Sequence, residues 1–65
     1  MIISVIQNGV QVGYVKSISY SKYTFAITKN RLHARRFSSN EVHSAIDVLA
    51  SMSFGKGYVF IYNMR

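Results

Sequence analysis

The fold is decided by the stretch Phe37-Ser38-Ser39-Asn40-Glu41-Val42, which contains the signals that start an α-helix. Ser38 and Glu41 have the spacing of a capping box, in which each side chain accepts a hydrogen bond from the other residue's backbone N–H. Phe37 and Val42 flank the box and form the hydrophobic staple that usually accompanies it. The pattern therefore predicts a helix that starts at about Ser39.

The predicted helix has one apolar side. Apolar residues recur at i, i+3, i+4, i+7 and i+8, which places them in one stripe along a helix: Val42, Ala45, Ile46, Leu49 and Ala50. Gly55 follows, and glycine readily adopts the left-handed conformation that ends helices. We expect the helix to run from Ser39 to Met52 or Ser53, with its stripe packed on a sheet.

Asn8-Gly9 lies between two stretches rich in β-branched residues and predicts a hairpin. Both residues tolerate positive φ, so a type I′ turn with Gln7 opposite Val10 is expected. Regular pairing beyond the turn would form a core-facing patch from two pairs, Val5 with Val12 and Ile3 with Tyr14. The opposite, more mixed face would carry Ile2, Ser4, Gln11 and Val15.

Two more strands are predicted further along the chain. Residues 17–22 are polar and indicate a loop, and Tyr23–Thr28 alternates apolar and polar side chains as a strand does. Lys29–Arg31 indicates a turn, whereas Leu32–Phe37 is compatible with an extended piece or an irregular turn. Tyr58–Tyr62 is apolar on both faces, which favours a central strand.

These elements occur in the order β-β-β-α-β. Because the amphipathic helix needs an apolar surface to bury its stripe, the sequence predicts an α+β fold. We expect one domain over residues 1–65, with a three- to four-stranded antiparallel sheet and one amphipathic helix packed on one face.

Composition restricts the function further. The 65 residues contain eight Lys and Arg against two Asp and Glu, for a formal charge of +6, and no cysteine. Such a balance favours anionic partners, and the missing thiols exclude disulfides. The apolar run 1–6 is too short for a signal peptide or a membrane span, so we expect a cytoplasmic protein without a membrane partner. An apolar fraction of 49% leaves a homo-oligomer open.

Signatures of catalysis are sparse. No phosphate-binding glycine loop or nucleophile elbow occurs, and the only carboxylates are Glu41 and Asp47. His43 and Asp47 are spaced i and i+4, which is compatible with the supporting half of a catalytic triad or with an ordinary solvated helix face. Two histidines without cysteine do not suffice for a metal site. We expect a chain that is not an enzyme and has no catalytic residues, cofactor or metal.

A basic segment precedes the helix. Its cationic residues and the histidine among them are the candidate binding residues for an anionic partner: Lys29, Arg31, His33, Arg35 and Arg36. Guanidinium groups fork onto phosphates and carboxylates, and the free N–H groups at the start of the helix, Ser38-Ser39, would add to an anion site. The alternative is that these charges only keep a small apolar protein in solution.

Five tyrosines provide candidates for contacts at the surface. Tyr20 and Tyr62 are the best placed, either for stacking on nucleic-acid bases or as anchors of a protein interface. Tyr14, Phe25 and Phe60 are more simply explained as core residues.

The stretch Tyr23–Tyr62 resembles small early or accessory proteins of tailed bacteriophages. In those proteins a strand ending in Thr leads to Ala-x-x-Phe, a capped helix and an apolar strand. The matching residues, over about two-thirds of the chain, are Phe25–Thr28, Ala34–Phe37, Ser38, Glu41, Ala45 and Tyr58–Tyr62. The resemblance implies a protein that binds and redirects a host protein, in the host cytoplasm. The positive charge departs from the commoner acidic pattern of the family, which weakens an interpretation as a nucleic-acid mimic.

Together these features predict a non-enzymatic, phage-type accessory protein that binds and modulates a host macromolecule. We expect its partner to be an acidic protein surface, bound through residues 29–36. Direct binding of RNA or DNA through the same residues is the alternative. A self-associating structural role and an enzyme built on His43 and Asp47 are the remaining hypotheses.

Overall fold

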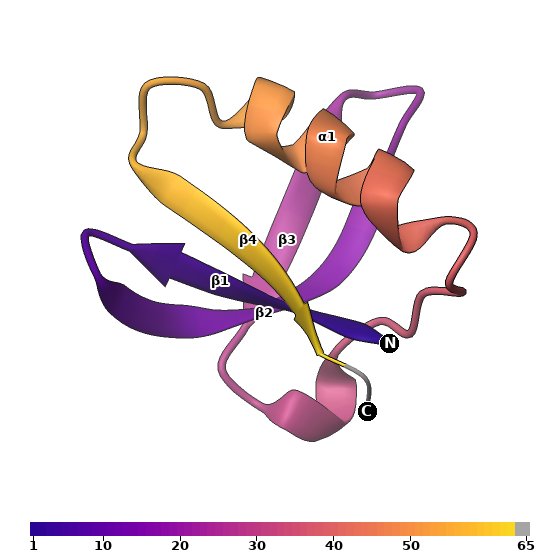
Figure 1. Ribbon diagram of the computed structural model, residues 1–65, viewed down its shortest axis with the longest axis horizontal. Coiled ribbons are helices and arrows are strands. Elements are labelled where there is room, and N and C mark those ends of the chain that lie inside the picture. The colour runs from indigo at the N-terminus through magenta and orange to yellow at the C-terminus, as the bar shows by residue number, and fades with distance from the viewer. Residues whose placement is uncertain (64–65) are drawn as a thin grey trace.

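Four antiparallel strands, a short 3-10 helix and one α-helix make up residues 1–63, the part of the chain that the computed structural model describes (Figure 1). The predicted α+β fold is confirmed. The elements are β1 (Ile2–Gln7), β2 (Val10–Ser19), β3 (Thr24–Thr28), η1 (Arg31–His33), α1 (Val42–Met52) and β4 (Tyr58–Asn63). The strands form one sheet in the order β3-β2-β1-β4, and α1 lies on one face of it.

The β1–β2 turn is as predicted. Asn8 and Gly9 have φ of 54° and 81°, which is the type I′ signature, and Gln7 lies opposite Val10. The pairing expected beyond the turn is wrong because of a β-bulge. Ile6 pairs with Gln11 and Val5 pairs with Gly13, so Val12 is an extra residue.

The bulge exchanges the faces of the residues that follow it, because side chains alternate along a strand. Tyr14 comes to lie opposite Ser4, not Ile3, and therefore leaves the core face. Val15 takes its place and is fully buried together with Ile3.

Strand β2 extends further than predicted, because Ser17–Ser19 belongs to it and not to a loop. A second bulge leaves Lys16 as an extra residue between the pairs Val15–Ile27 and Ser17–Ala26. The turn to β3 is confined to residues 20–23, and the predicted first residue of β3, Tyr23, lies in this turn with a φ of 56°. Thus the first half of β2 pairs with β1 and its second half pairs with β3.

Gly13 lies where β2 changes partners. A Cβ at this position would be 2.6 Å from the carbonyl oxygen of Thr28 and 2.8 Å from Cγ2 of Ile27. Both distances are far shorter than van der Waals contacts, so the end of β3 can approach β2 this closely only at a glycine.

The core lies between the sheet and α1. It contains eight buried side chains: Ile3, Val5, Val15, Phe37, Val42, Ala45, Leu49 and Phe60. The predicted helix stripe supplies three of them, and Phe37 and Val42 of the predicted staple are both buried. Ile46 packs against this cluster, whereas Ala50 is exposed.

Strand β4 is an edge strand, which corrects the prediction of a central one. Phe60 points to the helix and is buried, but Val59 and Ile61 on the opposite face are 54% and 47% exposed. The two central positions belong to β2 and β1, and residues 2–5 of β1 are buried on both faces. An apolar run alone does not distinguish these positions, because it contains no information about strand order.

The helix begins at Val42, three residues later than predicted, after a turn formed by residues 38–41. Ser38 Oγ accepts a hydrogen bond from the N–H of Glu41 at 3.1 Å, which is half of the predicted capping box. The other half is wrong, because the Glu41 carboxylate binds Tyr20 and Arg35 instead. The end is as predicted: α1 stops at Met52, and Gly55 has a φ of 83°.

We predict that Gly13→Ala destabilises the fold by about 1–3 kcal/mol, because the added methyl group must displace the backbone of β3. Urea unfolding measures the change. Gly9→Asn is the control, since no atom lies within 4 Å of a Cβ there and asparagine tolerates positive φ. A Gly13→Ala chain as stable as the control would show that β3 does not approach β2 this closely.

Candidate functional site

The basic segment forms a turn at one end of the sheet, residues 31–36, here named the basic turn. Asn30 starts it, because its Oδ1 accepts a hydrogen bond from the N–H of Leu32 at 2.9 Å. After η1 the chain becomes extended at Ala34, which resolves the two conformations left open for residues 32–37. The N–H of Arg35 donates to the carbonyl oxygen of Val15 at 2.9 Å and fixes the turn to β2.

The outer side of the basic turn combines an apolar side chain with two cations. Leu32 is 89% exposed at the tip of η1. Together with Arg31, Ala34, Arg36 and Ile2 it lines a groove of about 370 Å³. The guanidinium of Arg31 lies 5.9 Å from the ring centroid of Tyr14, so a cation–π contact holds this arginine over the sheet face that α1 leaves uncovered.

Arg35 points the other way and belongs to a polar cluster with Tyr20 and Glu41. Its Nη1 is 3.0 Å from Oε2 of Glu41, in the one ion pair that residues 1–63 form. The hydroxyl of Tyr20 donates to the same oxygen at 2.8 Å. The guanidinium also lies 4.4 Å from the ring centroid of Phe37. Arg35 and Tyr20 therefore hold the start of α1 against the sheet.

The cluster changes the acidity of both groups that it joins. The hydrogen bond from Tyr20, followed by that from Arg35, lowers the pKa of Glu41 below its ordinary value of 4.5. Desolvation raises the pKa of Tyr20, and the neighbouring Glu41 carboxylate adds to this effect. Glu41 is thus a carboxylate and Tyr20 a neutral phenol at neutral pH.

A second tyrosine of the β2–β3 turn binds the other end of the helix. The hydroxyl of Tyr23 forms a hydrogen bond with Oγ of Ser51, in the last turn of α1. The two tyrosines therefore attach both ends of α1 to a single turn of the sheet. Sequence patterns give no sign of this clamp, since its partners are 21 and 28 residues apart.

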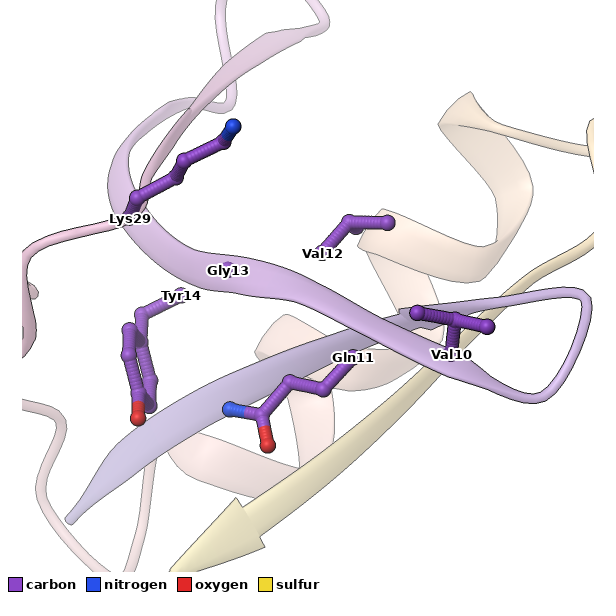
Figure 2. A pocket seen from close by; sticks show the side chains of 6 residues that line it. All are labelled: Val10, Gln11, Val12, Gly13, Tyr14 and Lys29. Atoms are coloured by element: carbon purple, nitrogen blue, oxygen red, sulfur yellow. The ribbon is translucent and has the colours of Figure 1, made fainter.

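The remaining predicted site residues lie in different places. His33 is exposed at the end of η1. Lys29 follows β3 and lines a separate groove beside β2, shown in Figure 2. Tyr62 lies on β4 and packs edge-to-face on His43 of α1, with ring centroids 5.2 Å apart. The structure therefore brings Arg31 and Arg36 together with Leu32 and separates Arg35, Tyr20 and Tyr62 from them.

Two backbone N–H groups at the helix start are used within the protein. The N–H groups of Glu41 and Val42 donate to the carbonyl oxygen of Ser38 at 3.1 and 3.0 Å. The Glu41 carboxylate itself lies beside Arg35, so a negative charge already occupies this place.

Groups suited to chemistry are dispersed. Residues 1–63 contain no group of three His, Asp or Glu side chains that is able to hold a metal ion. In the same residues His43 and Asp47 share no hydrogen bond, and His43 contacts Tyr62 instead. No helix in the described part of the chain is long and apolar enough to cross a membrane.

Leu32 is the site residue that the sequence predictions missed. The sequence offered one sign of it: Leu32 is an aliphatic residue within a basic segment and does not belong to the apolar stripe of the helix or to an alternating strand pattern.

No protein-family model, curated protein or solved structure matches the chain.

We predict that acid removes the contribution of the Tyr20–Glu41–Arg35 cluster to stability. The folded pKa of Glu41 is below its unfolded value, so the contribution is present above about pH 4.5 and is lost as the pH falls through the folded pKa. Because these side chains are about one-third exposed, we expect about 0.5–1 kcal/mol at pH 7.

Thermal unfolding of the wild type and of Glu41→Gln between pH 7 and pH 3 measures this contribution. The difference between the two chains should shrink in acid. Asp47→Asn is the control, since it leaves the cluster intact and should retain the acid-dependent loss. A difference between wild type and Glu41→Gln that does not change with pH would contradict the assignment.

Proposed function

We propose that this chain is a non-enzymatic binding module that docks on an acidic surface of another protein through the basic turn. One observation carries the proposal: Leu32 is 89% exposed and lines a groove with Arg31 and Arg36. An aliphatic side chain between two arginines matches a partner surface that has an apolar recess bordered by carboxylates.

Each component of this surface has a physical role in binding. Burial of Leu32 on a partner would contribute roughly 25 cal/mol for each Å² of apolar surface removed from water. The two guanidinium groups can fork onto carboxylates, and a net charge of +6 accelerates encounters with an acidic protein.

The same details favour a protein over a nucleic acid. Phosphate groups interact with cations, and an exposed leucine contributes nothing to that contact. Stacking of bases requires exposed aromatic faces near the cations. Tyr20 and Tyr62 keep 46% and 39% exposure, but Tyr20 belongs to the cluster with Glu41 and Tyr62 packs on His43 of α1, so neither ring lines the groove of the basic turn. The resemblance to accessory proteins of tailed bacteriophages supports a host protein as the partner, whose activity the bound chain would modulate.

The test is a selection of random displayed peptides against the immobilised chain. We expect selected peptides to combine Asp or Glu with aliphatic or aromatic residues. The double variant Arg31→Gln/Arg36→Gln should bind them at least about tenfold more weakly, since two charge-assisted contacts are lost. Arg35 is left in place because it holds α1.

The matched control is Lys22→Gln/Lys56→Gln, which removes two exposed charges outside the basic turn. Fluorescence anisotropy of labelled peptides compares the chains. An equal loss of peptide affinity in both double variants would show that only the net charge matters, and it would contradict a site at the basic turn. Titration with DNA and RNA at several salt concentrations tests the alternative: submicromolar binding at physiological salt, with a linear dependence of log affinity on log salt, would favour a nucleic-acid partner.

A further inference from the structure

The first half of β2 has an unoccupied side within residues 1–63. Pairing between β2 and β3 runs from Ser19–Thr24 to Tyr14–Thr28 and ends there. Pairing between β2 and β1 continues to Gln7–Val10 at the hairpin turn. Val10, Gln11 and Gly13 therefore pair with β1 on one side, and residues 10–13 pair with no strand on the other. The sheet therefore has an unpaired edge here that is long enough for one short strand.

A groove follows this unpaired edge. It measures about 560 Å³ and is lined by Val10, Gln11, Val12, Gly13, Tyr14 and Lys29. Figure 2 shows Gln11 and Tyr14 on one side of β2, with Val12 on the other, and Lys29 beside the end where β3 stops. Val10 and Gln11 are exposed along this edge, whereas Gly13 is buried where the end of β3 lies close against it.

We propose that an extended peptide segment of the protein partner binds here as an added strand, antiparallel to residues 10–13. It would continue the line of β3, which is itself antiparallel to β2. Backbone hydrogen bonds to an open sheet edge provide affinity in this mode of recognition, and side chains at alternate positions provide specificity. Four residues at about 3.3 Å each span the free edge.

The charges around the groove determine the character and direction of the peptide. Its lining contains one cation, Lys29, and no acidic residue. Arg31 lies over Tyr14, which lines the same end of the groove. An antiparallel strand begins at this end, so the peptide should have acidic residues at its N-terminal end, followed by β-forming residues. This inference rests on the proposed function, because the acidic part of the peptide would reach the basic turn.

The outer edge of β4 is also unpaired within residues 1–63 but fits an acidic peptide less well. Tyr58–Asn63 contains no charged residue, and neither groove described above is lined by β4. The combination of a free edge, a concave surface and cations at one end occurs beside β2.

The probe is a synthetic seven-residue peptide with two acidic residues at its N-terminal end, followed by alternating Thr and Val. Backbone pairing tolerates many sequences, so no further side-chain match is required. One control peptide has the acidic residues at its C-terminal end. A second control is the probe methylated at alternate backbone nitrogens, in two versions that together cover every amide. Amide chemical shifts and hydrogen exchange of the whole chain locate the bound peptide.

We expect the probe to shift and protect amides of residues 10–13. The methylated version that blocks the paired nitrogens should bind at least about tenfold more weakly. Lys29→Gln should weaken binding about two- to fivefold, whereas Lys22→Gln should have no effect. The control with C-terminal acidic residues should bind more weakly than the probe.

Three results would overturn the inference. No binding up to about millimolar peptide would exclude strand addition of useful affinity. Peptide binding that shifts the basic turn but not residues 10–13 would refute strand addition and leave the proposed docking surface intact. In the absence of peptide, the amides of residues 10–13 could become more protected from hydrogen exchange as the protein concentration rises. That result would assign the groove to a second copy of the chain. Conversely, the probe could bind beside residues 10–13 of the Arg31→Gln/Arg36→Gln chain with unchanged affinity. That result would contradict the proposed function but not strand addition.

Discussion

At Gly13 the backbone of β2 passes so close to the end of β3 that no Cβ fits between them. This contact lies between two bulges, at Val12 and Lys16, where β2 changes from one partner strand to the other. Bulges bend a strand and increase its twist, so β2 curves around the core. The curvature brings Val15 into the core and directs the chain after β3 towards the basic turn. The open groove beside residues 10–13 is another result of the same bend.

The small core is supplemented by polar contacts. A chain of 65 residues buries a smaller share of its surface than a larger domain does, and eight buried side chains form the core cluster. The Tyr20–Glu41–Arg35 cluster and the bond from Tyr23 to Ser51 attach α1 at its two ends. Because the β2–β3 turn supplies both tyrosines, the helix and this turn stabilise each other. Within residues 1–63 no buried side-chain polar atom lacks a partner.

Much of the fold could be predicted because its signals are local. The type I′ turn requires two residues with positive φ, and Asn8-Gly9 provides them; the helix stripe and the Gly55 stop are equally local. The register beyond the turn could not be predicted, since alternation assumes one residue opposite one residue and Val12 breaks that rule. The edge position of β4 depends on strand order, which an apolar run does not encode.

The candidate site was predictable in composition but not in arrangement. A cluster of arginines indicates an anionic partner, yet the pattern does not show that Arg35 pairs with Glu41, six residues later. Leu32 was missed because an isolated aliphatic residue in a polar turn belongs to no helical or strand repeat. Its exposure becomes apparent only when the 3-10 turn points it away from the core.

The basic turn divides its residues between two directions. Arg31, Leu32, His33 and Arg36 face outward, whereas Ala34 and Arg35 are half-buried. Substitutions at the outward positions touch neither the Glu41 contact nor the core, so they carry little risk for folding. Such a surface can diversify quickly under selection while its scaffold stays constant. The same four positions are therefore where side chains can be varied in the laboratory at little cost to the fold.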